Sequence, residues 1–561
     1  MSEKQDEQQI ELEVREMTCD SCALHVTKSL RGVEGVSQVH VPGWASSRAT
    51  ILTQSGVSDG QLVKAVKKAG YQATVLSRRN VTPQQLPEGW GQEVDYDLVV
   101  IGTGGAGTAA AIKSAELGRR ACIIEAGIVG GTCVNIGCVP SKALIRAAAA
   151  YYKAGHHPFA GVRTRVEGLD WSAVIDQKDQ LVGELCQTKY IDVLASYGDL
   201  ITLIHGRAAQ LGADGTVTLE NGHTIRAGGI VIATGARPRI LSLDGIEEVN
   251  VLTSTSAMAL EKQPRTLIIL GGRAIALELG QTFARFGTQV TVLQRSPRII
   301  PEHEPEIAEA LADYLRQEGL TIHTGVRLLA IHQGESEKVV ACKVNRQRRE
   351  FRAEQVLMAV GRTPNTQNMN LEQVGVDLDA GGFIQVNEFM QTSHPHIYAA
   401  GDVTNRPKLV YVAAAAGSIA AENALNGNST QLELTVLPDV IFTDPQVATV
   451  GLTEAQAKSQ GYKVQTSELP LAYVPRAIAA RDTRGLVKLV ADSDTGRLLG
   501  AHILAAEGGE VVQVATLAVK FGLTLDDLAG TLFPYLTQAE GLKLAVQTFN
   551  KDVAKLSCCA G

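Results

Sequence analysis

The chain has 561 residues, of which 45% are hydrophobic and 20% charged, and it carries a formal net charge of −7. This length predicts two to four domains, because one hydrophobic core does not grow to such a size, and the composition is typical of a soluble globular protein. The negative charge excludes an electrostatic case for binding nucleic acid or an anionic membrane. The polar start MSEKQDEQQI is no secretory signal, and no apolar run reaches the about 18 residues of a membrane helix, so we expect a cytoplasmic protein.

Residues 10–77 are predicted to form a compact N-terminal domain. The segment IELEVRE alternates apolar and polar residues like a half-buried strand, and the helix pattern after it places Ala23, Val26 and Leu30 on one face. Two strand patterns (VSQVHV and RATIL), a second helix pattern (DGQLVKAVKKAG) and a last strand pattern (QATVL) complete β-α-β-β-α-β, a ferredoxin-like fold. Residues 78–93 are polar, contain proline and lack periodicity, which indicates a linker.

Cys19 and Cys22 lie in MTCDSC, where the first helix is expected to begin. A helix N-terminus lowers the pKa of a thiol and favours the thiolate, and two thiolates at this spacing chelate a soft cation from a loop. A thioredoxin-like redox role is the alternative interpretation, but that fold needs a longer domain. The pattern therefore favours a metal-collecting domain.

From residue 94 the chain contains an internal repeat. The segments DLVVIGTGGAGTAAAIKSAELGRRACIIEAG and TLIILGGRAIALELGQTFARFGTQVTVLQRS superpose at a constant offset, which matches Gly102 with Gly271 and Glu125 with Gln294. Each copy has the pattern of an apolar strand, a glycine turn, an amphipathic helix and a second apolar strand. This is the pattern of a β-α-β unit that binds a dinucleotide, and it is present twice.

The first copy carries a complete G-x-G-x-x-G pattern at Gly102, Gly104 and Gly107. These glycines permit a tight turn, a close approach of the backbone to a pyrophosphate, and close packing of helix on strand. The amides at the helix N-terminus then face the phosphate oxygens. The carboxylate of Glu125 suits two unmodified ribose hydroxyls and repels a 2′-phosphate.

The second copy departs from this pattern. Arg273 occupies the second glycine position, which alters the approach to the pyrophosphate, although an arginine there can pair with a phosphate. Neutral Gln294 replaces the acid, Arg295 follows it, and Arg298 is nearby. The loss of a carboxylate and the gain of guanidinium groups favour a 2′-phosphate, so we expect NADPH at this copy. The alternative is that Arg295 and Arg298 are solvated surface charges.

A pair of cysteines, Cys133 and Cys138, lies in GGTCVNIGCVPSK. On a regular helix the two side chains point about 140° apart. A disulfide between them therefore needs a distorted first turn, which Gly137 and the amide-free Pro140 permit. Such a bond is easily reduced, which favours a redox-active role over a buried, unreactive pair. Three further cysteines are expected to be inert: Cys122, Cys186 and Cys342.

The segment GGTCVNIGCVPSKAL, with ATGARP, AVGRTPN and YAAGDV, resembles the flavin disulfide reductases, and the resemblance covers about residues 94–550. It implies that the first nucleotide is FAD and that Asp402 bonds its ribityl chain. It also implies that Cys138 is the charge-transfer thiolate beside the flavin, Cys133 the interchange thiol, and Lys142 a neighbour of flavin N5. The expected contacts to FAD and NADPH together are Gly102, Gly104, Gly105, Ala106, Gly107, Glu125, Gly131, Thr132, Lys142, Thr234, Gly235, Gly271, Arg295, Gly361, Gly401 and Asp402.

The fold class implied is α/β, with two Rossmann-like domains and an α+β dimerisation domain after the ferredoxin-like domain. The expected divisions are FAD domain 94–236 and 359–432, NADPH domain 237–358, dimerisation domain 433–550, and a C-terminal tail 551–561.

Relatives that act on disulfides carry a His-Pro-x-x-x-Glu segment near the C-terminus. Here the stretch is FPYLTQAEGLK, with Tyr535 at the histidine position and Glu540 retained. A phenol has a pKa of about 10, so it is poorly suited to protonate a leaving thiolate near neutral pH. The adjacent Cys558 and Cys559 near the chain end cannot easily bond to each other, because the ring would be strained, but as two thiols they can capture and release a soft ion.

An ion exchanged between dithiols and then given two electrons suggests Hg²⁺ going to Hg⁰. The C-terminal segment NKDVAKLSCCAG and the segment MTCDSCALH near the N-terminus extend the resemblance to the mercuric ion reductase family. It implies mercury detoxification by a homodimer in which the tail pair reaches the partner subunit's flavin site. Tyr190, in TKYIDVL, resembles a second tyrosine at the mercury site, the alternative being a helix-surface aromatic. The expected mercury ligands are Cys19, Cys22, Cys133, Cys138, Cys558 and Cys559.

Two rival functions stay open at this point. One is a reductase of organic disulfides, against which Tyr535 argues. The other is a metal-buffering protein with a vestigial flavoprotein body, against which the complete first glycine pattern and GTCVNIGC argue.

Overall fold

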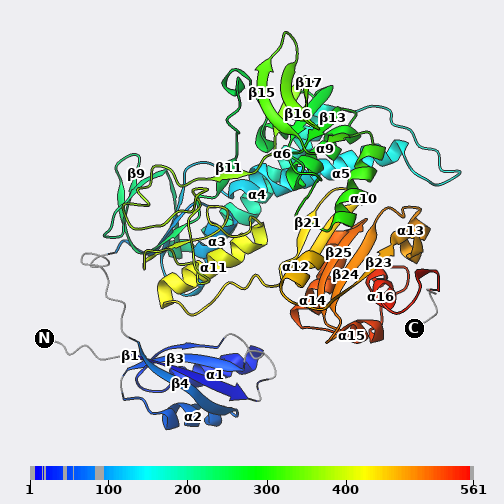
Figure 1. Ribbon diagram of the computed structural model, residues 1–561. Helices are drawn as coiled ribbons and strands as arrows, with labels where there is room; N and C mark the ends of the chain where they lie inside the picture. Colours follow the sequence, from blue (N-terminus) through cyan, green and yellow to red (C-terminus); the bar gives the residue numbers. More distant parts are fainter. Residues whose placement is uncertain are drawn as a thin grey trace. The chain divides into compact units, whose positions relative to one another are not determined.

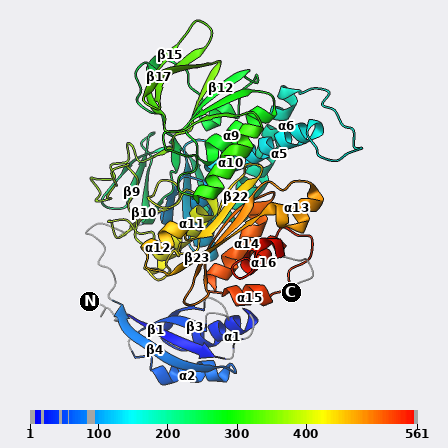
Figure 2. The ribbon, with the colours of Figure 1, turned by 45° about the vertical axis from the view of Figure 1, so that its right-hand side comes forward.

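The computed structural model describes residues 7–15, 17, 20–41, 47–54, 56–81 and 94–555. The chain divides into two compact units, Met1–Trp90 and Gly91–Gly561 (Figures 1 and 2). In the described part of the chain, no helix has both the length and the apolar character that a membrane crossing requires.

The N-terminal unit is the expected β-α-β-β-α-β fold with an antiparallel sheet in the order β2-β3-β1-β4. Its elements are β1 (Glu7–Arg15), α1 (Asp20–Arg31), β2 (Val36–His40), β3 (Arg48–Gln54), α2 (Asp59–Lys68) and β4 (Gln72–Val81). Alternating residues of β1, Ile10 and Leu12, are fully buried with Val26 and Leu30 of α1. Strand β1 and helix α1 therefore each bury the face that the alternating and the helical pattern of the sequence predicted.

The predicted start of the linker at residue 78 is wrong by four residues. Strand β4 continues to Val81, which pairs with Glu7 of β1. The Arg78 guanidinium forms an ion pair with Asp59 at 2.5 Å. Polar side chains do not end a strand whose backbone is still bonded to a neighbour, so composition alone placed the boundary too early.

The first dinucleotide unit is built on a seven-stranded sheet. Its parallel core has the order β7-β6-β5-β10, with β20 parallel to β10 on the other side. The elements are β5 (Tyr96–Ile101), α3 (Gly105–Glu116), β6 (Ala121–Glu125), β7 (Ile201–His205), β8 (Ala208–Leu211), β9 (Thr216–Leu219), β10 (Thr224–Ile232), β20 (Ile397–Ala399) and α11 (Val410–Asn426). Helices α3 and α11 pack together beside this sheet (Figure 1). Strand β20 and helix α11 thus complete the domain that begins with β5. This domain is therefore formed from two separate parts of the sequence.

The second dinucleotide unit lies between these two parts in sequence. Its parallel sheet has the order β14-β13-β12-β18, and a three-stranded antiparallel sheet, β15-β16-β17, accompanies it. The elements are α8 (Ser254–Ala257), β12 (Thr266–Leu270), α9 (Ala274–Arg285), β13 (Gln289–Leu293), α10 (Pro305–Gln317), β14 (Thr321–His323), β15 (Arg327–Gln333), β16 (Lys338–Val344), β17 (Gln347–Ala353) and β18 (Gln355–Met358). A short ribbon of β11 (Ala236–Pro238) and β19 (Arg362–Pro364) joins the entry and exit of this unit.

The C-terminal domain is a five-stranded antiparallel sheet in the order β21-β22-β25-β24-β23. Its elements are β21 (Asp439–Ile441), β22 (Gln446–Gly451), α12 (Glu454–Ser459), β23 (Val464–Pro470), α13 (Pro475–Ala480), β24 (Leu486–Asp492), β25 (Leu498–Ala505), α14 (Gly508–Lys520), α15 (Leu525–Gly530) and α16 (Glu540–Gln547). Helix α14 packs on β22 and β25, and one hydrophobic cluster joins α14 and α16 to the strands (Figure 2).

The cysteine segment lies on helices that connect the first sheet to the rest of the molecule. They are α4 (Gly131–Ile136), α5 (Cys138–Gly155), α6 (Trp171–Cys186), a π-helical turn (Gln187–Ile191) and α7 (Asp192–Ser196). Helix α5 packs against both α4 and α9, so the cysteines lie between the two dinucleotide units.

Candidate active site

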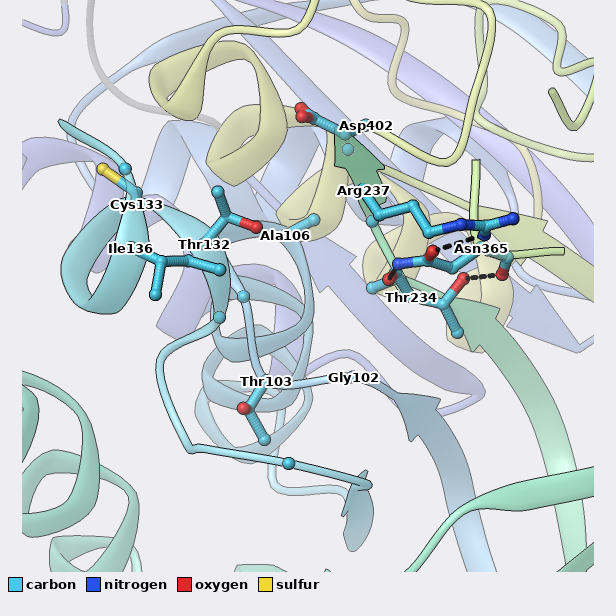
Figure 3. Close-up of a pocket in the computed structure, with 18 of the residues that line it drawn as sticks. Gly102, Thr103, Ala106, Thr132, Cys133, Ile136, Thr234, Arg237, Asn365 and Asp402 are labelled. Carbon is cyan, nitrogen blue, oxygen red and sulfur yellow. Dashed lines mark hydrogen bonds between the residues drawn. The ribbon is translucent and has the colours of Figure 1, made fainter. Parts of the chain in front are cut away.

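A cavity of about 790 Å³ runs along the carboxyl edge of the first parallel sheet. Cofactors bind at this edge of open α/β sheets. The expected residues that line it are Gly102, Gly104, Gly105, Ala106, Glu125, Gly131, Thr132, Cys133, Cys138, Lys142, Thr234, Gly235, Gly401 and Asp402. Figure 3 shows Thr132, Cys133 and Ile136 on one side of the cavity and the hydrogen-bonded cluster of Thr234, Arg237 and Asn365 on the other.

The glycines of the first turn are needed for backbone packing. Gly102 has φ of +105°, and a Cβ there would stand 2.4 Å from the carbonyl oxygen of Ala233. Gly107 does not line the cavity, but a Cβ on it would stand 1.8 Å from the carbonyl oxygen of Gly102. A Cβ on Gly131, at φ of +62°, would stand 2.6 Å from the Cα of Gly104. The turn at 130–131 is therefore pressed against the phosphate loop, and both present bare backbone to the cavity.

Glu125 lies at the end of β6, where the sequence places the ribose ligand. Its Oε2 accepts hydrogen bonds from the Thr103 amide at 3.1 Å and from the Thr103 hydroxyl, and its Oε1 accepts from the Gly127 amide at 2.6 Å. A carboxylate has about four acceptor positions, so it can still receive a ribose hydroxyl. The hydrogen bonds from Thr103 and Gly127 fix the orientation of the Glu125 carboxylate.

Asp402 faces the same cavity beyond the 400–401 turn. Burial raises the pKa of this carboxyl, and the Arg362 guanidinium, with Nε 3.3 Å from Oδ2, opposes the rise. A half-buried acid near the two cations Arg362 and Lys408 suits a hydrogen bond to a ligand hydroxyl. Bare glycine backbone, a fixed carboxylate at one end and a half-buried acid further along together fit FAD.

The cysteines lie on either side of a break in the helix. Helix α4 ends at Ile136, α5 begins at Cys138, and Gly137 between them has φ of −133° and ψ of −112°. A Cβ on Gly137 would meet the Thr132 carbonyl oxygen at 2.8 Å. The prediction of a distorted first turn is confirmed. The two sulfurs are not bonded to each other in the structure.

The two thiols differ in acidity. The hydrogen bond from Cys133 lowers the pKa of Cys138 to about 7, with Lys142 assisting and burial and Glu278 opposing. The same hydrogen bond, with burial, raises the pKa of Cys133. Cys138 is therefore the sulfur that ionises first near neutral pH, whereas Cys133 stays a thiol, which agrees with the roles that the resemblance implied.

Lys142 is held by two groups that the sequence reasoning missed. Its Nζ lies 2.7 Å from Oε2 of buried Glu278 and 4.4 Å from the ring centroid of Phe442. The Phe442 amide donates to the other Glu278 oxygen at 2.9 Å. Glu278 had a visible signal, since it is a carboxylate among the apolar residues of the second repeat. Phe442 comes from the C-terminal domain, and no local pattern links it to Lys142.

Tyr190 lies on the π-helical turn after α6, a rare geometry that is common at functional sites. A Cβ on Gly130 would meet its ring at 3.4 Å. Burial raises the pKa of the Tyr190 phenol, and the nearby Cys133 and Cys138 add to the rise. The structure therefore places this tyrosine beside the cysteine pair rather than on an open helix surface.

The second glycine turn has the same backbone and a different lining. Gly271 has φ of +118°, and a Cβ there would stand 2.3 Å from the Ala359 carbonyl oxygen. Gln294 is buried with its side chain over Gly272, whereas Arg295 is exposed. Gly271 and Arg295 belong to this second unit and do not line the first cavity, and neither does Gly361, at φ of +115°.

The remaining expected residues lie away from the cavity or outside the described residues. Tyr535 is 56% exposed on the C-terminal domain and does not line the cavity of its own chain. Cys22 lies at the start of α1, partly buried against the N-terminal core. Cys19, Cys558 and Cys559 lie outside the described residues. The three cysteines expected to be inert, Cys122, Cys186 and Cys342, are buried.

Comparison with known families covers most of the chain. The pyridine nucleotide-disulphide oxidoreductase model matches residues 96–417, the dimerisation domain of the same class matches 437–546, and the heavy-metal-associated domain matches 11–72.

Individual relatives agree with these matches. The chain is 45% identical to a mercuric reductase of Staphylococcus aureus, over 98% of both chains, and 42% identical to one of Shigella flexneri, over 98% of this chain and 100% of the relative. The solved HOCl-induced flavoprotein disulfide reductase RclA from Escherichia coli superposes with a TM-score of 0.72 at 29% identity, over 81% of this chain and 99% of that one. LpdA from Mycobacterium tuberculosis gives 0.72 at 25% identity, over 81% and 100%.

Proposed function

This chain belongs to the mercuric reductases, within the pyridine nucleotide-disulphide oxidoreductases, and we propose that it reduces Hg(II) to Hg(0) with electrons from NADPH. The observation that carries the proposal is the Cys133–Cys138 pair, which lies at a helix break in the cavity with one thiol acidified. Two sulfurs without a hard ligand suit a soft divalent ion.

The cavity of the first unit would hold FAD, with Glu125 at the ribose and Asp402 further along. Bound FAD supplies a carrier that takes two electrons from NADPH and gives them to sulfur or to a sulfur-bound ion. The second glycine turn would hold NADPH, with Arg295 as the contact to its 2′-phosphate.

Cys138 and Cys133 perform different parts of the reaction. Both sulfurs bind Hg(II): Cys138, the more acidic of the two, binds as a thiolate, and Cys133 loses its proton as it becomes a ligand. Two electrons from NADPH convert the bound ion to a neutral atom, which has little affinity for thiolate and leaves. Both sulfurs are released as thiolates with their oxidation state unchanged, and Cys133 takes up a proton again. The Lys142 ammonium beside Cys138 favours the anionic sulfur before and after the ion is bound.

We place the complete site at a homodimer interface, with Cys558 and Cys559 of the partner subunit delivering the ion and Tyr535 and Tyr190 assisting the exchange. The match to the dimerisation domain supports this arrangement. So does the exposed apolar segment around Tyr535, where Leu532 is 92% and Leu536 44% exposed, because exposed apolar surface marks protein contacts.

The N-terminal domain is proposed to collect Hg(II) on Cys19 and Cys22 and to pass it to the tail pair by thiolate exchange. The match to the heavy-metal-associated domain supports this role. Removing residues 1–93 is expected to leave kcat for thiol-complexed Hg(II) unchanged in the purified enzyme, because the residues that line the cavity belong to the second compact unit.

The decisive experiment is NADPH oxidation with thiol-complexed Hg(II), together with detection of volatile elemental mercury. The double substitution Cys558→Ala/Cys559→Ala should lower turnover sharply. Cys342→Ala, which removes a thiol buried in β16 away from the cavity, controls for the loss of a cysteine. Metal-independent reduction of oxidised glutathione would instead support the disulfide reductase, and no metal-dependent oxidation at all would support the metal buffer.

A further inference from the structure

Arg273 is the residue at which the second dinucleotide unit departs most from the first. It is the N-cap of the 12-residue helix α9, as Gly104 is the N-cap of α3. Its φ of −110° and ψ of −171° are extended, so an ordinary side chain is carried there without strain. In the first unit the 130–131 turn is pressed against Gly104, whereas the Arg273 side chain is 66% exposed.

The guanidinium of Arg273 is only loosely held. Its Nε lies 3.4 Å from Oε2 of Glu302, whose side chain is 43% exposed. Among the residues that the structure describes, none forms a hydrogen bond with its two terminal nitrogens. Glu302 belongs to the loop after β13, which is tied to the glycine turn by the Ile300 amide donating to the Gly272 carbonyl at 2.9 Å. Arg273, Glu302 and the start of α9 therefore lie together at the second glycine turn.

We propose that Arg273 binds the pyrophosphate of NADPH directly and exchanges Glu302 for it. An exposed ion pair contributes little, whereas a guanidinium and a phosphate form paired, charge-assisted hydrogen bonds. The amides at the start of α9 favour an anion in the same place. The arginine thus replaces the glycine's close backbone approach with a side-chain contact.

This inference rests on the proposed use of NADPH and adds a division of labour. The pyrophosphate is common to NADPH and NADH, so Arg273 raises the affinity for both nucleotides. Arg295, at the carboxyl end of β13, meets only the 2′-phosphate and separates one nucleotide from the other. Affinity and selectivity then belong to two different arginines.

The test is calorimetric titration of the oxidised holoenzyme with NADP⁺ and NAD⁺, neither of which reduces the enzyme. Arg273→Ala should raise both dissociation constants by about tenfold. Arg273→Lys should restore part of the lost affinity, because lysine keeps the positive charge but lacks the paired donors of the guanidinium. Glu302→Gln should lower both constants by about two- to fivefold, because the competing carboxylate is gone. Arg295→Ala, the matched control, should raise the constant for NADP⁺ alone.

Two results overturn the inference. If Arg273→Ala leaves both constants unchanged, the arginine makes no contact. If it weakens NADP⁺ alone, its partner is the 2′-phosphate. Flavin absorbance and the melting temperature confirm that each variant is folded, and mercury turnover is measured separately, so failure here is distinguishable from failure of the proposed function.

Discussion

The two β-α-β units show which parts of a glycine turn are set by the backbone and which by the surroundings. At the first glycine they are the same: a Cβ on Gly102 or on Gly271 would stand 2.4 or 2.3 Å from a carbonyl oxygen of the neighbouring strand. At the third position they differ. A Cβ on Gly107 would stand 1.8 Å from a backbone oxygen, yet the second unit carries a buried Ala276 there. The first unit is thus packed against other backbone at Gly102 and Gly107, whereas the second carries side chains at Arg273 and Ala276.

The largest expected effect comes from adding one methyl group at the tightest point. Gly107→Ala should give protein purified without flavin and a free energy of unfolding lowered by about 1–3 kcal/mol, because the helix must move off the strand. Flavin absorbance and thermal melting measure both. The opposite change in the second unit, Ala276→Gly, should keep flavin and cost about 1 kcal/mol. A flavin-saturated Gly107→Ala variant of unchanged melting temperature would show that the packing difference is not real.

The residues at the two strand ends, acidic Glu125 and neutral Gln294, provide the next comparison. Glu125→Ala leaves the Thr103 and Gly127 amides without their acceptor and removes the ribose ligand, so FAD affinity should fall by about 100-fold. Gln294→Ala, the matched change in the second unit, should leave FAD binding as it is. Reconstitution of the apoenzyme with FAD measures both; equal losses in the two variants would contradict the assignment of FAD to the first unit.

Nucleotide choice should respond to a single charge. In Arg295→Glu a carboxylate repels the 2′-phosphate, and the preference for NADPH over NADH should fall by about tenfold to hundredfold. The ratio of kcat/KM for the two nucleotides is the measurement. An unchanged ratio would mean that Arg295 is a solvated charge.

The smallest expected effect concerns the thiols that line the cavity of the first unit. Because the pKa of Cys138 is lowered to about 7, its thiolate fraction should fall about tenfold between pH 8 and pH 6. Alkylation of the reduced enzyme by iodoacetamide, located by mass spectrometry, should follow this curve at Cys138 and be slow at Cys133, whose pKa is raised. Equal alkylation of both cysteines would contradict the conclusion that Cys138 is the more acidic sulfur.

Sequence reasoning succeeded where a pattern is local. The glycine turns, the end of β6 at Glu125 and the distorted turn at Gly137 follow from spacing within about 30 residues. It failed where contacts are long-range: Glu278 and Phe442 lie 136 and 300 residues from Lys142 and meet it only through packing. The linker boundary failed for a related reason, since the pairing of Glu7 with Val81 is invisible to composition.

Helix α9 follows its N-cap Arg273 at the second glycine turn, and further along it holds the segment that carries Phe442. Gln281, one turn after Glu278, forms two hydrogen bonds of 2.8 Å with the main chain of Asp444, and Arg285 contacts the Asp444 carboxylate at 3.1 Å. Helix α9 is therefore bonded to the segment around Asp444 at several points along its length. A rotation of the second dinucleotide unit that let a nucleotide leave would have to break those bonds or carry the C-terminal domain with it. Either movement displaces Glu278, the counter-ion of Lys142.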